Sequence, residues 1–445
     1  MNDPVRVFVV LATVAGLVLA FVMPPSAAPD ESRHLSRVYL MSEGRFGVPG
    51  TVGPRASVPK SIPELYRAIE GADHEHPPLH TVGEIAAFLH QPLDPERRVG
   101  IANAGTYPPV VYLPHLIGVA FGRWLGLAPA GLIYLGRLAS LAAWIALTAL
   151  AIRIAPARRW TLALLSLTPM SVACAASISA DPVTSAAALL FTACAMRAAC
   201  GEGPLAKSEL RGLVGSALFL GVVKPGYLPL ALAALAIPPS RTGGRSRRLG
   251  LAAGLAAAIA VPMLAWMAHA QAQAPTPPIP KADPAAQLAA ILADPIYFAK
   301  VLWHTWRVFG PGYWTSAIGH LGPLIVALPG AVYAGFTALL VATIALDGPP
   351  PAALATPRRW WLVAATALSI GAVFVFAYLG WNEVGAPFVN GIQGRYFTPA
   401  LPLLAFALPA RSAPLPSRMR ELLVAGVTGT FVATAIAIVG VYYRW

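Results

Sequence analysis

Two adjacent carboxylates directly after the first apolar segment could support acid–base chemistry. Asp30 and Glu31 stand at the start of a predicted helix that continues to about Glu43. On this helix Glu31 and His34 share a face, and Arg37 lies one turn further along. A carboxylate held at a membrane surface can act as a general base, whereas the alternative is that Asp30 only caps the helix. We predict that Asp30 or Glu31 is the base, and the choice between them stays open.

A third acidic residue and three cations lie within or beside other apolar segments. Asp181 precedes a proline, which is typical of a helix start, so a capping role and a site role are both open. Lys224 separates two short apolar segments, and Arg137 lies inside a longer one. Arg395 and Tyr396 follow a glycine, which allows close approach of a phosphate. Charged groups at such positions are functional candidates, but Lys224 or Arg395 could instead pair with a lipid phosphate or a loop carboxylate.

A histidine-rich run in the first long loop is the one candidate for a metal site. Asp73, His74, Glu75, His76 and His80 lie within eight residues, but a pair of prolines interrupts them and their spacing matches no zinc signature. We therefore expect no resident cofactor, while a divalent metal bound by the three histidines stays an open alternative.

The composition places all of these residues in a membrane protein. Of the 445 residues, 57% are hydrophobic and only 11% are charged, against about 25% charged in soluble domains. This excludes an ordinary soluble enzyme. The net charge of +13 does not indicate nucleic-acid binding, because most basic residues flank apolar segments, as membrane topology requires.

Eleven apolar segments predict an all-α polytopic protein with a single integral membrane domain over residues 1–445. About 20 apolar residues cross a bilayer, and several segments are shorter, which indicates broken or tilted helices. The predicted spans are Val7–Met23, Ala130–Ile152, Trp160–Ile178, Pro182–Ala199, Leu210–Val223, Gly226–Ile237, Leu249–His269, Leu324–Leu346, Trp360–Leu379, Tyr396–Leu408 and Leu422–Tyr443.

The segment Pro108–Leu127 decides the sidedness of everything after it. If it lies along the membrane instead of crossing, nearly all arginine-rich connections fall on one side, which the positive-inside rule makes cytoplasmic. The amino terminus is then cytoplasmic and the carboxyl terminus extracytoplasmic. Residues 24–129 and 270–323 form two extracytoplasmic loops.

Both loops carry signals for short helices. Ser61 and Thr81 each precede a glutamate by three residues, which is the capping-box pattern. Asp283 and Asp294 each precede a proline, which suits a capped helix start. The aromatic-rich stretch 297–314 is typical of a helix at the membrane interface.

An ordered set of motifs along nearly the whole chain resembles a known family. The motifs are Pro29–Arg37, Tyr107–Pro114, Arg137-Leu138, Pro169-Met170, Ser177–Asp181, Lys224-Pro225 and Gln393–Pro399. Together they resemble the bacterial membrane-protein family catalogued as domain of unknown function 2142. That family is distantly similar to the glycosyltransferase C superfamily, which includes protein mannosyltransferases and aminoarabinose transferases of lipid A.

The resemblance implies transfer of a sugar from a polyprenyl-phosphate donor to a cell-envelope polysaccharide, lipid or protein at the outer face of a bacterial plasma membrane. In the superfamily the first outer loop carries an essential acidic residue, which corresponds to Asp30-Glu31, and an interfacial helix, which corresponds to Pro108–Leu127. The substrate-binding residues that we expect are His34, Arg37, Arg137, Asp181, Lys224, Arg395 and Tyr396. We expect membrane lipids as further partners.

Two other functions remain open from the sequence. A transporter or flippase for a lipid-linked sugar predicts polar residues along a path through both membrane halves. A non-catalytic protein of envelope assembly predicts that Asp30, Asp181 and Arg395 lie on separate surfaces.

Overall fold

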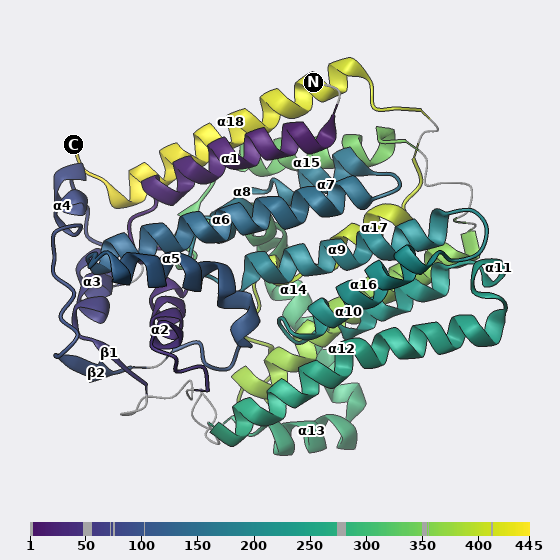
Figure 1. Cartoon of the computed structure of the whole chain (residues 1–445), viewed down its shortest axis with the longest axis horizontal. Helices are drawn as coiled ribbons and strands as arrows, with labels where there is room; N and C mark the ends of the chain where they lie inside the picture. Colours follow the sequence, from purple (N-terminus) through teal and green to yellow (C-terminus); the bar gives the residue numbers. More distant parts are fainter. Residues whose placement is uncertain are drawn as a thin grey trace.

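The computed structural model describes residues 3–47, 56–71, 73, 76–101, 103–273, 282–348, 354, 356–410 and 413–445. Within these residues, six helices are long and apolar enough to cross a membrane, and a bent pair described below would make seven. The six are α1 (Pro4–Val22), α6 (Pro129–Ile154), α9 (Asp181–Cys200), α12 (Arg245–Gln273), α16 (Thr356–Trp381) and α18 (Ser417–Tyr442). The prediction of an all-α polytopic protein is confirmed, and Figure 1 shows long helices lying side by side.

The predicted count of eleven spans is not confirmed, because five of the predicted segments form shorter elements. These are the pair α7 (Arg159–Ser166) and α8 (Pro169–Ala175), then α10 (Lys207–Gly221), the 3-10 helix η3 (Leu228–Ala236), α15 (Gly330–Leu346), and η4 (Gly394–Tyr396) with α17 (Leu401–Ala407). Prolines explain part of this, since Pro169 begins α8 after a break and a proline cannot continue the preceding helix.

Helix α9 occupies the centre of the bundle. In its most apolar window 78% of the residues are buried, against 17% in the corresponding window of α12. Because the two helices have similar composition but different surroundings, hydropathy alone does not separate a central helix from a peripheral one. The position of α9 places Asp181, its first residue, inside the protein.

The first loop folds into short elements at one end of the bundle. They are α2 (Glu31–Ser42), β1 (Ser57–Pro59), α3 (Ser61–Glu70), α4 (Val82–Ala87), β2 (Arg98–Gly100), η2 (Pro109–Tyr112) and α5 (Leu113–Trp124). Strands β1 and β2 pair antiparallel, with Ser57 opposite Gly100. The capping box at Thr81 is confirmed. The one at Ser61 is wrong, because Lys60 occupies the N-cap position and Ser61 is already helical.

The segment that decided the predicted sidedness forms η2 and α5, and its place along the membrane stays a prediction. Helix α5 has 12 residues, about 18 Å of rise, against a hydrocarbon core of about 30 Å. It packs on α6 so closely that a Cβ at Gly118 would lie 2.2 Å from the Leu135 carbonyl oxygen. This contact is consistent with a helix resting against the bundle.

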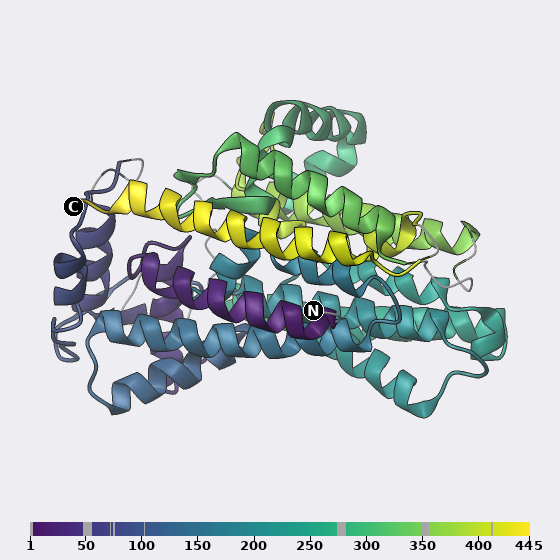
Figure 2. The same cartoon turned by 90° about the horizontal axis from the view of Figure 1, so that it is seen from above.

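The second loop forms a bent helix pair, α13 (Pro284–Ala293) and α14 (Pro295–Gly319), which meet at an angle of 107°. Asp283 and Asp294 cap the two helices, as predicted. Trp303 and Trp306 of α14 are exposed, as expected of a helix in contact with lipid. Figure 2 shows this pair, in green, rising from one face of the bundle. A short hairpin of β3 (His320–Leu321) and β4 (Val326–Ala327) follows.

Two buried arginines join connections at the end of the bundle opposite the first loop. Arg158 donates to the carbonyl of Leu408 at 2.6 Å and caps the end of α17. Arg241, in α11 (Pro239–Thr242), pairs with Glu209 at 2.8 Å. The carboxyl terminus lies instead beside the first loop, where the His80 amide donates to the carbonyl of Tyr442 (Figure 1).

A buried carboxyl group links the first loop to α18 and makes stability depend on pH. Glu70 is 1% exposed and accepts a hydrogen bond from the Tyr442 hydroxyl at 3.3 Å. Burial raises the pKa of Glu70 from 4.5 to about 7, although the bond from Tyr442 opposes the rise. Ionisation of this group therefore opposes folding. The contribution of the protonated group to the free energy of unfolding is fully present below pH 4.5, and it is lost as the pH rises through 7.

Replacing Glu70 by glutamine should therefore flatten the pH dependence of stability between pH 4.5 and 7, which thermal unfolding in detergent measures. The matched control is Glu64→Gln, on the exposed side of the same helix. This variant should keep the wild-type dependence of stability on pH. Equal slopes for the wild type and Glu70→Gln would contradict the assignment.

Candidate functional site

Four charged residues that are distant in the sequence converge on one ion network. Asp181 Oδ2 lies 2.8 Å from Arg395 Nε, and Asp181 Oδ1 lies 3.2 Å from Lys224 Nζ. Arg395 Nη2 lies 3.6 Å from Asp30 Oδ2. We call Asp30, Asp181, Lys224 and Arg395 the ion network. It joins the start of α2, the start of α9, the connection after α10, and η4.

Neither acidic side chain of the network caps its helix, so the capping alternative left open for Asp30 and Asp181 is wrong. Asp30 has a left-handed backbone with φ 57° and makes no capping hydrogen bond. This conformation is unusual outside glycine but is tolerated by aspartate and asparagine. The N-cap of α9 is Ala180, and the Asp181 side chain faces the two cations. The Asp30 carboxylate remains half exposed, while that of Asp181 is largely buried.

A glycine holds Arg395 in place. A Cβ at Gly394 would lie 1.9 Å from the Tyr313 carbonyl oxygen, so only glycine fits against the backbone of α14. The Gly394 amide also donates to the Ser316 hydroxyl at 2.9 Å. Arg395 is 7% exposed, and its Nη1 has no hydrogen-bond partner among the described residues. The network therefore keeps an unused donor.

Aromatic rings surround the lysine of the network. Lys224 Nζ lies 3.8 Å from the ring centroid of Tyr396 and 5.4 Å from that of Tyr107. Burial lowers the pKa of Lys224, but the Asp181 carboxylate and the nearby tyrosines outweigh it and raise the pKa well above the ordinary value. Lys224 is therefore a cation at neutral pH.

A histidine–tyrosine pair lies beside the network. His34 Nδ1 and the Tyr112 hydroxyl are 2.6 Å apart. Burial lowers the pKa of His34 to about 4, although Asp30 and Asp181 oppose the shift, so the imidazole is neutral at pH 7. Arg37, one turn along α2, is buried and donates through Nη2 to the Phe46 carbonyl at 2.6 Å.

Glu31 and Arg137 form a separate, closed ion pair. Both side chains are 0% exposed, and Arg137 Nη2 lies 2.5 Å from Glu31 Oε2. Glu31 also accepts from the amides of Ser26 and Ile178. The other acceptors of the guanidinium are the carbonyls of Ala20, Met23 and Pro24. Because all five donors of Arg137 and the acceptor sites of Glu31 are occupied, this pair joins α1, α2, α6 and the turn before α9.

The metal candidates do not meet in the part of the chain that the structure describes. His76 pairs with Asp73 at 3.0 Å on the surface. His80 is buried, and its Nε2 lies 3.2 Å from the Ile69 carbonyl oxygen. His74 lies outside the described residues. Among the described residues, no group of three or more histidine, cysteine, aspartate or glutamate side chains could hold a metal ion.

Sequence reasoning missed three residues that shape the site. Tyr107 and Tyr112 contact Lys224 and His34, and His115 Nε2 lies 3.3 Å from both the Ser177 carbonyl oxygen and the Ser179 amide. All three lie in or next to the motif Tyr107–Pro114, which was used only for the family resemblance. The close spacing of polar rings and prolines was the signal available.

The comparisons with known proteins define the class of the chain first. Residues 13–404 match the family model described as "Predicted membrane protein (DUF2142)". The chain is a membrane protein and belongs to this family, so the resemblance drawn from the motifs is confirmed.

Among solved structures, the chain is similar to the crystal structure of ArnT from Cupriavidus metallidurans bound to undecaprenyl phosphate. The similarity has 14% sequence identity and a TM-score of 0.44, and covers 97% of this chain and 76% of that chain. No curated protein matches the chain.

Proposed function

We propose that this protein is a membrane glycosyltransferase that moves a sugar from a polyprenyl-phosphate donor to a cell-envelope acceptor at the ion network. The observation that carries the proposal is the convergence of Asp30, Asp181, Lys224 and Arg395 from four separate elements. A non-catalytic membrane scaffold has no need of a buried arginine and a partly buried lysine beside a half-exposed carboxylate, and such groups are costly inside a membrane protein.

Asp30 is the proposed base. Its carboxylate is half exposed and lies at the open side of the network, whereas every oxygen of Glu31 is engaged by Arg137 or by backbone amides. A base must reach the proton that it removes, and only Asp30 of the two has a free approach. The left-handed backbone of Asp30 turns its side chain toward Arg395.

Lys224 and Arg395 are proposed to hold the phosphate of the donor. The acceptor hydroxyl attacks the anomeric carbon, the bond from that carbon to the phosphate oxygen breaks, and Asp30 takes the hydroxyl proton. The phosphate gains one negative charge as it leaves, while Asp30 loses one. The two cations then face one remaining carboxylate, Asp181, and stabilise the leaving group electrostatically.

The proposed location is a bacterial plasma membrane, with the ion network on the extracytoplasmic side. The elements of the first loop and the carboxyl terminus lie at one end of the bundle, and the basic connections joined by Arg158 and Arg241 lie at the other. Assigning the basic end to the cytoplasm follows the positive-inside rule. The donor and membrane lipids would then reach the network from the outer leaflet.

The test uses the full chain in proteoliposomes supplied with a panel of polyprenyl-phosphate hexoses and pentoses and with a cell-envelope extract. We expect release of free polyprenyl phosphate from at least one donor, dependent on the extract and detected by mass spectrometry. Intact donors in every case, with no release above protein-free vesicles, would contradict the proposal.

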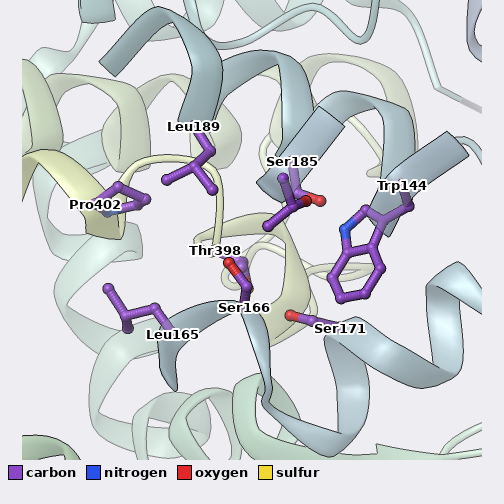
Figure 3. Close-up of a pocket in the computed structure, with 9 residues that line it drawn as sticks. Trp144, Leu165, Ser166, Ser171, Ser185, Leu189, Thr398 and Pro402 are labelled. Carbon is purple, nitrogen blue, oxygen red and sulfur yellow. The ribbon is translucent and has the colours of Figure 1, made fainter. Parts of the chain in front are cut away.

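A cavity inside the bundle favours a second candidate, movement of a lipid-linked sugar across the membrane. Most of its lining surface is apolar, and its polar side chains are those of Trp144, Thr148, Ser166, Ser171, Ser185 and Thr398 (Figure 3). Ser185 lies one turn after Asp181 on α9, so this helix contributes a residue to both the ion network and the cavity. In the same vesicles, this candidate predicts donor that crosses the bilayer and stays uncleaved.

A further inference from the structure

Arg37 is a buried cation that its surroundings do not satisfy. Its side chain is 0% exposed, and its only hydrogen bond in the described part of the chain is that from Nη2 to the Phe46 carbonyl. Nε and Nη1 are buried without a hydrogen-bond partner, and no described carboxylate forms an ion pair with Arg37. A guanidinium does not lose its proton in a protein, so the charge persists.

Two other buried arginines, Arg137 and Arg241, are compensated by a counter-ion, whereas Arg158 donates to the carbonyls of Ile344 and Leu408 and forms no ion pair among the described residues. Arg137 uses all of its donors and has Glu31 as its counter-ion. Arg241 donates to three carbonyls and pairs with Glu209. An isolated buried charge is strongly unfavourable unless it is paired and hydrogen-bonded. The environment of Arg37 is therefore incomplete in a way that an anion would complete.

The position of Arg37 relates it to the proposed reaction. His34 and Arg37 lie three residues apart on one face of α2, and Asp30 is the N-cap residue directly before this helix. The helical rise from Glu31 to Arg37 is about 9 Å. The His34–Tyr112 pair lies between them. Arg395, a cation of the ion network, lies 3.6 Å from the Asp30 carboxylate.

We propose that Arg37 binds an anionic group, a carboxylate or a phosphate, of the acceptor, so that this protein glycosylates an acidic saccharide or lipid. This inference rests on the proposed function, since it takes Asp30 as the base that meets the acceptor hydroxyl. One molecule then spans from its hydroxyl at Asp30 to its anionic group at Arg37. Nε and Nη1 supply donors that no group in the described part of the chain uses.

The test measures thermal unfolding of the full chain in detergent with glucuronate, glucose 6-phosphate or glucose as probes. Glucuronate and glucose 6-phosphate carry the two anionic groups, and glucose is their neutral match. For the wild type we expect a higher melting temperature with at least one anionic probe and no shift with glucose. The probe that raises the melting temperature shows whether the site binds a carboxylate or a phosphate.

Two variants assign the effect to Arg37. Arg37→Met should unfold at a temperature no lower than the wild type, because it removes an unpaired buried charge, and it should lose the stabilisation by the anionic probes. Arg33→Met removes the same charge from an exposed position on the same helix and should keep that stabilisation. Failure of Arg37→Met to fold, or retention of the full anion effect by it, would overturn the proposal.

The outcome is separable from that of the proposed function. If polyprenyl-phosphate sugars are never cleaved but the anion effect depends on Arg37, the anion site stands and the transferase proposal fails. If donors are cleaved but no anionic probe stabilises the wild type, the acceptor assignment fails while the transferase proposal stands.

Discussion

Replacing Asp30 by asparagine should reduce sugar transfer by about 10²- to 10⁴-fold, the usual contribution of a positioned general base. Asparagine tolerates the left-handed backbone that Asp30 adopts, and it keeps the size of the side chain. The fold should therefore be retained, since the carboxylate is half exposed and makes only one long contact, to Arg395. Release of polyprenyl phosphate from the donor measures the loss, and the melting temperature verifies the fold.

The matched control is Asp294→Asn, in the second loop. Asp294 is exposed and caps α14, and asparagine is an equally good cap, so both activity and stability should be unchanged. Transfer by Asp30→Asn within a few-fold of the wild type would exclude Asp30 as the base. Glu31 could not replace it without first breaking the pair with Arg137.

Replacing Glu31 by alanine should lower the free energy of unfolding by about 3–5 kcal/mol, because it leaves Arg137 buried and unpaired. The carboxylate also accepts the amides of Ser26 and Ile178, which would lose their partners. The effect should therefore appear as unfolding at much lower temperature or denaturant concentration, before any question of activity arises.

Glu84→Ala provides the comparison for this effect. Glu84 pairs with Arg444 at 2.5 Å, but both side chains are about half exposed, so solvent screens the pair. Although Glu84 also completes the capping box of α4, its loss should lower stability far less than the loss of Glu31. A comparable loss of stability in Glu31→Ala and Glu84→Ala would show that the buried Glu31–Arg137 pair stabilises the fold no more than an exposed pair does.

The difference between Asp30 and Glu31 illustrates what the sequence cannot decide. Neighbouring residues on a helix point about 100° apart, so one of them faces the protein interior and the other does not. Which one faces inward depends on Arg137, a residue 106 positions later, and on the turn at Ile178. The local pattern predicted the helix after Asp30 closely, because capping and periodicity are local properties, but not the partner of either carboxylate.

The predicted number of spans was not confirmed for a related reason. Hydropathy measures how strongly a segment avoids water, and it does not measure whether the segment crosses a bilayer or packs inside a bundle. The residues 226–237 are as apolar as a span, yet they form a short 3-10 helix after the Lys224-Pro225-Gly226 turn. The arginine distribution predicts that Pro108–Leu127 lies along the membrane, and this sidedness stays a prediction, although α5 within that segment has only 12 residues.

The ion network was predictable only in part. Each of its members was singled out because a charge beside an apolar segment demands a reason. The pairing of Asp181 with both Lys224 and Arg395 was not predicted, because a loop carboxylate or a lipid phosphate was an equal alternative as their partner. Their meeting depends on α9 being central and on Gly394 fitting against α14.

The most direct test is an experimental structure of the full chain with bound polyprenyl phosphate. We expect the phosphate oxygens within about 3 Å of Lys224 Nζ and Arg395 Nη1, with the Asp30 carboxylate facing the side from which an acceptor would enter. A phosphate bound elsewhere, with the contacts from Asp181 to Lys224 and Arg395 unchanged and no density at the network, would contradict the central claim.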